Sequence, residues 1–427
     1  MTSARLEFYS TQRRRCCLKL RIGQIEQLTT LTVQFKLLTG FEMKSKYDVV
    51  VIGAGCIGVS VASHLGDMGC TNVLVIEKEK MIGTGATAKC AGGVRAQFST
   101  PINIHMSHYS IHEFEKLDAE YGIQFVQCGY LFVVKTEEQK AQYLRNMEIQ
   151  KKYGVDVRFV SKDEISKLAP NYGLEKVLGG TFGAKDGLVD PYMMVDAYFK
   201  KSRKMNIEFE TDMPCTGLKG SDGKITHVVT PQGAIACDYV VNAAGPFAKE
   251  IGAFVDVEIP IEPLRRMITT TGALDFMSDA FPMVVDVTTG MYMHKEGNGL
   301  LIGLANNNEK PGYDETIDNE FLDTMLMTAL EVMPYLENAE IKTKYPGTWA
   351  GLYETTPDHH SILDRVPNYN NFIIAGGFSG HGLMHAPAAG QAAAELIVKG
   401  KSETFDLHPV RFSRFAEGDL TVEKNVI

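Results

Sequence analysis

Three glycines and a glutamate early in the chain have the types and spacing that could hold a dinucleotide. Gly53, Gly55 and Gly58 follow an apolar run, and a second apolar run ends at Glu77. Such glycines let the backbone turn tightly and approach a pyrophosphate, which the N–H groups and positive dipole end of the next helix can bind. A carboxylate after the second strand can accept hydrogen bonds from ribose hydroxyls. The predicted dinucleotide residues are Gly53, Ala54, Gly55, Cys56, Ile57, Gly58, Glu77 and Lys78.

The elements around these glycines must be a buried strand, a helix and a second strand. Residues 47–52 form an apolar run typical of a central parallel strand. Ile57, Val61 and Leu65 recur at helical spacing, and Gly69 follows where a helix C-cap is expected. A glycine-rich turn alone is a weak signal in a chain with 40 glycines. The complete order of elements favours a dinucleotide-binding unit over an incidental turn.

Length, composition and charge narrow the class of protein. A chain of 427 residues is too long for one ordinary core, so we expect two domains, and its 44% hydrophobic content indicates a globular protein. The net charge is −9 and no basic field is evident, which argues against nucleic-acid binding. No apolar stretch approaches the roughly 20 residues that span a bilayer, so we expect no transmembrane segment.

The cysteines and histidines indicate neither disulfides nor a metal centre. The eight cysteines include no C-x-x-C pair and no Cys/His cluster with zinc spacing. We interpret them as reduced thiols and expect a cytoplasmic protein. His105, His108 and His112 share one face of a predicted helix, but no carboxylate stands at ligand spacing, and we predict no metal site.

The first 42 residues differ in composition from the rest. They contain three consecutive arginines at 13–15 and only three acidic residues. Two interpretations stay open: an Arg-rich, acid-poor transit peptide, or an extension upstream of a translation start at Met43. We favour the second because Met43 lies just before the first predicted strand. In both cases residues 1–42 form an extension outside the fold prediction and need not belong to the mature protein.

The predicted parallel strands lie in three separate segments of the chain. They lie near the N-terminus, near residue 238 and near residue 372, and shorter runs between them resemble antiparallel strands. We expect a helix from Asp318 to Leu336, and another from Ala386 to Lys399 with Pro387 in its first turn. This order implies a nucleotide domain into which a second sheet domain is inserted in two pieces. The predicted nucleotide domain comprises 46–105, 180–256 and 346–415, and the second domain comprises 106–179 and 257–345.

Five motifs in order resemble those of the D-amino-acid oxidase family of FAD-dependent amine oxidoreductases. They are the glycine fingerprint, Gly83-x-Gly-Ala-Thr, Val240-Val-Asn-Ala-Ala-Gly, Trp349-Ala-Gly-Leu-Tyr-Glu-Thr-Thr-Pro-Asp358 and Ala375-Gly-Gly-Phe-Ser-Gly-His-Gly382. The resemblance runs from about Lys46 to Phe415 and is greatest to the β subunits of L-proline dehydrogenases and sarcosine oxidases. It implies an α/β fold, in which a Rossmann-like FAD-binding domain of glutathione-reductase type carries an inserted, mainly antiparallel β-sheet substrate domain (α+β).

The resemblance also implies FAD, rather than NAD, as the cofactor. One fingerprint serves one ADP group, and a nicotinamide enzyme would not need the two further glycine-rich loops. The second loop leads into the helix predicted from Ala386, whose N-terminal dipole can stabilise negative charge on a reduced flavin. The cofactor residues predicted in the later motifs are Gly85, Ala86, Thr87, Cys90, Ala91, Gly92, Gly93, Ala243, Ala244, Gly245, Gly351, Gly377, Phe378, Ser379, Gly380, His381, Gly382, Leu383 and Met384.

The implied reaction oxidises the C–N bond of a small amine. A hydride equivalent leaves the carbon next to the nitrogen and reaches flavin N5, with L-proline or a sarcosine-like N-methyl amino acid as the leading substrate class. Arg95 is our candidate to bind the substrate carboxylate, because a guanidinium can bind it through two hydrogen bonds. Tyr292, on a strand expected to cover the flavin, and His381, in the glycine loop, complete the predicted catalytic set.

Departures from the relatives refine this prediction. Leu301 stands where monomeric sarcosine oxidases have an oxygen-activating lysine, so we expect a dehydrogenase that passes electrons to a carrier or to partner subunits of a hetero-oligomer. Gly351 replaces the cysteine that tethers FAD, which favours non-covalent FAD, although a tether at Cys90 stays open. Tyr353 replaces the carboxylate-binding arginine of glycine and D-amino-acid oxidases. An additional FMN is expected only with a partner subunit.

Three alternatives stay open at this point. The chain could be a sarcosine-type oxidase that produces hydrogen peroxide, or a flavin-bound assembly or scaffold protein without turnover. An NAD-dependent dehydrogenase is the third, and a yellow purified protein would exclude it. His359 and His360, after Pro357-Asp358, are interpreted as ordinary loop residues.

Overall fold

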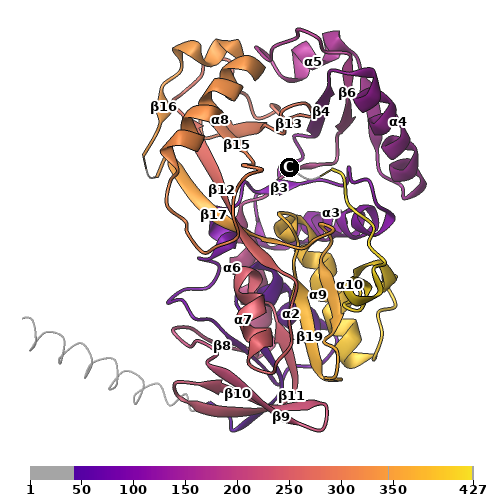
Figure 1. The fold of residues 1–427 in the computed structure, drawn as a ribbon, viewed down its shortest axis with the longest axis vertical. Coiled ribbons are helices and arrows are strands. Elements are labelled where there is room, and N and C mark those ends of the chain that lie inside the picture. Colours follow the sequence, from indigo (N-terminus) through magenta and orange to yellow (C-terminus); the bar gives the residue numbers. More distant parts are fainter. Residues whose placement is uncertain (1–42, 345, 426–427) are drawn as a thin grey trace, which may run out of the picture. The chain divides into compact units, whose positions relative to one another are not determined.

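The computed structural model describes residues 43–344 and 346–425. All helices and strands of this part lie from Lys46 onward and are shown in Figure 1. Among them, no helix is both long and apolar enough to cross a lipid bilayer. The predictions for residues 1–42 lie outside the described residues.

The first β-sheet contains the parallel strands that the sequence predicts in three separate segments. Its strand order is β18-β19-β11-β1-β2-β8, and β19, β11, β1, β2 and β8 run parallel to their neighbours. Antiparallel strands extend it, because β18 pairs with β19 and the β9–β10 hairpin pairs with β11. The bounds are β1 Lys46–Ile52, β2 Val73–Ile76, β8 Glu208–Glu210, β9 Gly217–Ser221, β10 Lys224–Thr230, β11 Gly233–Asn242, β18 Ile362–Arg365 and β19 Phe372–Gly376.

Two helices pack closely against each other beside this sheet. They are α2 (Cys56–Asp67) and α9 (Gly382–Val398), side by side in Figure 1. A Cβ atom at Gly390 would collide with the side chain of Ser60, so only glycine allows this approach. The other helices and short helical turns are η1 Ala86–Lys89, α3 Pro101–Tyr121, α4 Glu137–Lys152, α5 Lys162–Leu168, α6 Pro191–Lys204, η2 Gly245–Phe247, α7 Ala248–Ala253, α8 Asn319–Val332, η3 Pro334–Asn338, η4 His408–Val410 and α10 Arg414–Glu417.

Helix α9 begins at Gly382, four residues before the predicted start. The prediction placed Pro387 in the first turn, but this proline lies inside the helix. Neighbouring helices satisfy the backbone around it: Ser60 Oγ donates to the carbonyl of Ala386 at 2.7 Å, and the N–H of Ala388 donates to Ser110 Oγ at 3.3 Å. The predicted helix from Asp318 to Leu336 also differs, because α8 ends at Val332 and Pro334 starts a separate 3₁₀ turn.

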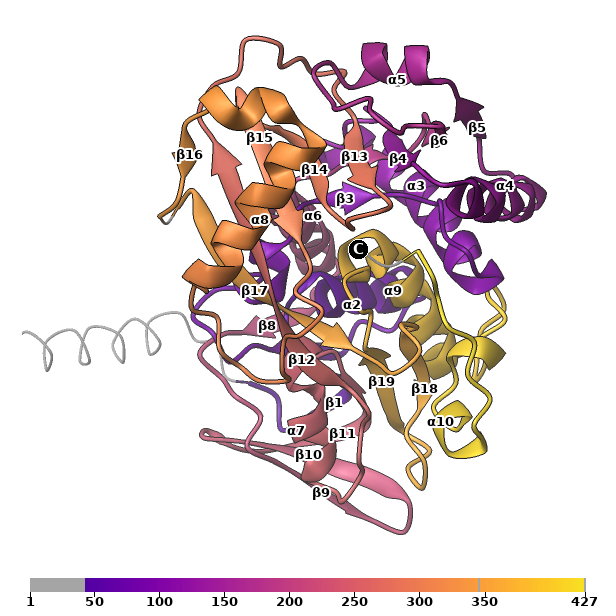
Figure 2. The same cartoon turned by 45° about the horizontal axis from the view of Figure 1, so that its top comes forward.

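The second sheet is mainly antiparallel, as predicted. Its order is β16-β12-β15-β14-β13-β4-β6-β5, with β17 paired to β12; only the β4–β13 pair is parallel. Figure 2 shows α8 in front of β12 and β15. The bounds are β4 Tyr130–Val134, β5 Val157–Val160, β6 Gly179–Gly183, β12 Glu262–Thr271, β13 Met283–Asp286, β14 Tyr292–Glu296, β15 Gly299–Leu304, β16 Ile341–Lys342 and β17 Thr348–Thr355, and a separate small sheet pairs β3 (Gly93–Val94) with β7 (Gly187–Leu188).

The two faces of the second sheet have different neighbours. On β15, Leu300 and Ile302 pack with apolar residues of α8. Leu301 points to the other face, where it packs with Tyr292 and Ile268. This second face contacts the glycine-rich segment through Ala91, so it is the face that can cover a ligand held there.

The predicted domain boundaries remain a proposal. The first sheet and its helices correspond to the proposed nucleotide domain, and the second sheet to the proposed substrate domain. Strands β6 and β17, which the prediction assigns to the nucleotide domain, are hydrogen-bonded members of the second sheet.

Candidate cofactor and substrate site

The fingerprint turn leads from β1 into α2 by close backbone approaches. Gly53 has φ +102°, and a Cβ atom there would collide with the carbonyl of Ala243. A Cβ atom at Gly58 would collide with the carbonyl oxygen of Gly53. The predicted Ala243–Gly245 segment therefore lies directly against the turn. No side chain can stand between β1 and α2 here, which fits a turn that presents its backbone N–H groups to phosphate.

Glu77 lies beside the fingerprint turn, where its carboxylate is held by two backbone donors. The N–H of Ala54 donates to Oε2 at 2.8 Å, and the N–H of Glu79 donates to Oε1 at 3.0 Å. A carboxylate oxygen can accept further hydrogen bonds, so Glu77 can still bind ribose hydroxyls. The ammonium of Lys78 lies 3.7 Å from the centre of the Phe247 ring and pairs with Glu79 at 3.2 Å.

The second predicted cofactor segment closes over the start of α2. The N–H of Cys56 donates to Thr87 Oγ1 at 3.1 Å. Trp349 Nε1 donates to the carbonyl of Lys89 at 3.0 Å, which joins this segment to β17. Three predicted segments, 53–58, 85–93 and 243–245, thus converge at the carboxyl ends of the parallel strands, the place where open α/β sheets bind ligands.

A pocket lies between the glycine-rich segment, the start of α9 and one face of the second sheet. This face, which carries Tyr292 and Leu301, is called the inner face below. The pocket has an empty volume of about 480 Å³, including the part open to solvent. It brings together all three predicted catalytic residues, whereas Gly351, Gly377, Phe378 and Ser379 are not among its lining residues. The lining residues are Cys90, Ala91, Gly92, Gly93, Arg95, Tyr130, Met283, Tyr292, Tyr353, Gly380, His381, Leu383 and Met384.

Tyr130 and Met283 are pocket residues that the sequence prediction missed. They are direct neighbours in the parallel β4–β13 pair. Both precede runs of valines and leucines that read as ordinary buried strands, so only the strand pairing shows that they line a pocket. Burial raises the pKa values of Tyr130, Tyr292 and Tyr353, so the pocket is lined by neutral phenols.

Arg95 is fully buried, and no carboxylate in the described part of the chain forms an ion pair with it. Nη1 donates to the carbonyl of Gln97 at 2.9 Å, and Nη2 donates to the carbonyl of Asn425 at 2.5 Å. The guanidinium carbon lies 3.9 Å from the centre of the Phe98 ring. Nε has no hydrogen-bond partner among the described residues. Arg95 therefore gives the pocket a positive charge, but backbone carbonyls already occupy two of its nitrogens.

His381 is a neutral neighbour of Arg95. Its burial, together with the charge of Arg95, holds the pKa of its imidazole well below the ordinary value. Nε2 lies 3.4 Å from Nη2 of Arg95, and the ring meets Phe98 edge-on. A neutral Nε2 can accept a hydrogen bond from the guanidinium, so His381 can orient Arg95 without adding a second charge.

A C-terminal segment beyond the predicted domain end at 415 contacts Arg95, one of the pocket residues. The carboxylate of Glu423 accepts hydrogen bonds from the N–H and hydroxyl groups of Ser99 and Thr100 and from Asn103 Nδ2. Burial opposes its charge, but these hydrogen bonds hold the pKa of Glu423 below its ordinary value. Asn425 then reaches Arg95. A single acid in a polar tail gives no sequence signal for these contacts.

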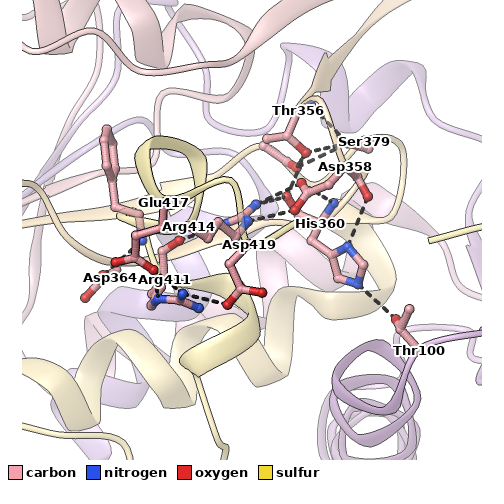
Figure 3. Close-up of polar contacts among 12 residues, drawn as sticks. Thr100, Thr356, Asp358, His360, Asp364, Ser379, Arg411, Arg414, Glu417 and Asp419 are labelled. Atoms are coloured by element: carbon pink, nitrogen blue, oxygen red, sulfur yellow. Dashed lines mark hydrogen bonds and ion pairs between the residues drawn. The ribbon is translucent and has the colours of Figure 1, made fainter. Parts of the chain in front are cut away.

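A buried ion pair braces the turn that follows β17 (Figure 3). Arg414 binds Asp358 through Nε at 2.8 Å and Nη2 at 3.0 Å, and both side chains are almost completely inaccessible. Nη2 of Arg414 also donates to the carbonyl of His360, which accepts a further hydrogen bond from Thr356 Oγ1 at 2.7 Å. His360 Nε2 lies 2.9 Å from Thr100 Oγ1. His360 is therefore a structural part of this brace.

Two positions bear on how a flavin could be attached. Burial raises the pKa of the Cys90 thiol to about 11, so the nucleophilic thiolate is disfavoured. A Cβ atom at Gly351 would lie 2.8 Å from Cβ of Lys89, so this position is tightly packed against the glycine-rich segment. The close backbone cradle at 53–58 and the pocket beside 90–93 together fit an extended dinucleotide whose second half lies in the pocket.

Comparisons with known proteins agree with this geometry. The L-proline dehydrogenase from P. horikoshii is 33% identical and superimposes with a TM-score of 0.83 over 89% of this chain and 100% of that one. FAD-dependent oxidoreductase domain-containing protein 1 of Xenopus laevis is 28% identical, with 91% of this chain and 86% of the relative covered.

A third relative is longer than this chain. Human mitochondrial dimethylglycine dehydrogenase is 27% identical over 90% of this chain, which spans only 46% of that enzyme's length. Residues 48–396 match the model described as FAD dependent oxidoreductase (DAO). The chain therefore belongs to the DAO family of FAD-dependent oxidoreductases.

Proposed function

We propose that this chain is a dehydrogenase that oxidises the C–N bond of a small secondary amino acid, with L-proline or a sarcosine-like N-methyl amino acid as substrate. The pocket is the observation that carries this proposal: it is lined by tyrosines, it contains a guanidinium with no carboxylate partner among the described residues, and it adjoins the fingerprint turn. The names of relatives, which include L-proline, dimethylglycine and sarcosine dehydrogenases, support the substrate class.

The residues that would hold FAD are those of the fingerprint turn, Glu77, Thr87 and the Ala243–Gly245 segment. The buried, protonated thiol of Cys90 and the packed Gly351 favour non-covalent binding. When bound, FAD supplies the acceptor for the two electrons that leave the substrate. The start of α9 supplies a positive helix-dipole end beside the pocket.

The remaining pocket residues bind and orient the substrate. Arg95 attracts a carboxylate, and neutral His381 keeps the guanidinium in place. The phenols of Tyr292 and Tyr353 can accept or donate hydrogen bonds without adding charge at neutral pH. The aromatic walls exclude water, which strengthens electrostatic contacts with a bound amino acid.

We also propose that electrons leave to a carrier or partner subunit instead of oxygen. Leu301 lies on the inner face of the second sheet, packed with Tyr292 and Ile268. A leucine cannot stabilise the negative charge of a forming superoxide, whereas a lysine there could.

The six described cysteines are free thiols, which supports a reducing compartment such as the cytoplasm.

The test is to compare turnover in air with turnover on an artificial dye acceptor, for the wild type and for Leu301→Lys. With L-proline or sarcosine, the wild type should reduce the dye and form little hydrogen peroxide, and Leu301→Lys should raise the peroxide yield. Rapid, stoichiometric peroxide formation by the wild type would contradict the dehydrogenase assignment and favour a sarcosine-type oxidase.

A further inference from the structure

Two consecutive arginines on β12 have opposite electrostatic surroundings. Arg265 faces away from the pocket and pairs with three acids: Glu309 at 3.2 Å, Asp314 at 3.2 Å and Asp318 at 3.5 Å. Arg266 points to the other face of the sheet, and none of the described carboxylates pairs with it. Nη1 donates a hydrogen bond to the carbonyl of Arg265 at 2.9 Å, and the buried Nε has no partner in the described part of the chain.

The strand pairing places Arg266 beside the pocket wall. Arg266 is the direct neighbour of Gly351 on β17, so it shares a face with Tyr353 and Thr355. Its guanidinium carbon lies 5.2 Å from the centre of the Tyr353 ring, and Tyr353 lines the pocket. Burial raises the pKa of Tyr353, and the charges of both Arg266 and Arg95 oppose that rise. The Tyr353 ring therefore lies between the pocket, which Arg95 also lines, and the guanidinium of Arg266, which is not itself a lining residue.

Two more polar atoms, at and just after the end of β17, also lack partners among the described residues. They are Oγ1 of Thr355 and Nδ1 of His359, both buried and without a hydrogen bond among the described residues. His359 follows β17 in the turn that the Asp358–Arg414 pair braces. Burial mainly lowers the pKa of His359, and the charges of His360 and Arg266 lower it further.

An anion would satisfy the buried Nε of Arg266. Leaving a buried donor without a partner is unfavourable, so such groups normally meet a ligand, a water or another side chain. A guanidinium and a hydroxyl both donate hydrogen bonds, and a carboxylate accepts up to four. The Nε and Nη2 edge of arginine matches the two oxygens of a carboxylate.

We propose that Arg266 makes the direct contact with the substrate carboxylate, while Arg95 contributes charge and positions its surroundings. The contrast with Arg95 supports this assignment, because the carbonyls of Gln97 and Asn425 already occupy two Arg95 nitrogens. The proposal rests on the proposed oxidation of an amino acid and names the residue that selects amino acids over simple amines.

The experiment uses the holoprotein, with Arg266→Met compared with the control Arg265→Gln from the opposite face of the strand. The substrate pair is L-proline and its neutral analogue L-prolinamide, mixed anaerobically while flavin reduction is followed. Arg266→Met should weaken L-proline binding about 30- to 100-fold and change the L-prolinamide response less than about 3-fold. Arg265→Gln should leave the L-proline affinity within about 3-fold of the wild type.

A second readout does not depend on turnover. Calorimetric binding of cyclopentanecarboxylate, which has no amine to oxidise, is compared with that of neutral cyclopentanecarboxamide. Arg266-dependent binding of the carboxylate would support the anion site even if no amine reduces the flavin, in which case only the proposed function fails. The inference is overturned if Arg266→Met binds both L-proline and cyclopentanecarboxylate as the wild type does, or if the wild type does not distinguish the carboxylate from the carboxamide.

Discussion

The fingerprint turn and the pocket differ in how their polar groups are satisfied. At the turn, backbone contacts fix the geometry, and the acid of Glu77 already has two donors. In and beside the pocket, Nε of Arg95 and Nε of Arg266 are buried without partners among the described residues. The chain's own backbone contacts form the first region, which can bind phosphate through its N–H groups. We propose that a charged ligand completes the second region, which would then determine specificity.

The largest expected effect comes from breaking the turn. Gly58→Ala places a Cβ atom against the carbonyl oxygen of Gly53, and α2 must move away from β1. We expect the free energy of unfolding to fall by about 5 kcal/mol and the variant to purify without FAD. Gly312→Ala is the matched control, because nothing lies within 4 Å of its added Cβ atom. Flavin content measured by absorbance checks this; a Gly58→Ala protein with full FAD would refute the role of the turn.

A smaller effect is expected from removing the brace behind the pocket. Asp358→Asn leaves Arg414 buried without its charged partner and should lower the free energy of unfolding by about 3 kcal/mol. The control is Asp196→Asn, which breaks an exposed pair with Lys200 and should change it by less than about 0.5 kcal/mol. Chemical denaturation measures both. Equal losses in the two variants would show that the brace adds no stability.

The smallest effect concerns the pH dependence of stability through Glu354. Burial raises its pKa to about 7 from 4.5, although hydrogen bonds from Gly377 and Phe378 oppose the shift. Folding therefore favours the protonated acid. The contribution of Glu354 to the free energy of unfolding is fully present below pH 4.5 and is lost as the pH rises through 7. Glu354→Gln should remove on the order of 2 kcal/mol of this pH-dependent change. Denaturation at pH 5 and pH 8 checks this, and an unchanged pH profile would contradict it.

The difference between the fingerprint turn and the pocket also explains which features could be predicted from the sequence. The fingerprint could be found because its function depends on glycines and on local strand and helix patterns. The two-sheet architecture followed from the spacing of apolar runs. The start of α9 was placed wrongly because Pro387 usually marks a first turn, whereas Ser60 and Ser110 on other helices allow it inside this one.

The pocket was predicted only in part because its residues meet through long-range pairing. Nothing in Leu-Arg-Arg-Met shows which arginine faces the acids, since that depends on the register of β12 with β17. Glu423 and Asn425 could not be assigned from an isolated polar tail. His359 and His360 were interpreted as ordinary loop residues, yet His360 joins the brace, and Nδ1 of His359 is buried without a partner among the described residues.

The most direct test of the central claim is anaerobic mixing of the yellow holoprotein with L-proline, sarcosine and related N-methyl amino acids. The account predicts that at least one of these secondary amino acids bleaches the visible flavin absorbance completely, with formation of the corresponding imine or its hydrolysis product. Unchanged absorbance with every member of the panel, in a protein that retains full FAD, would contradict it.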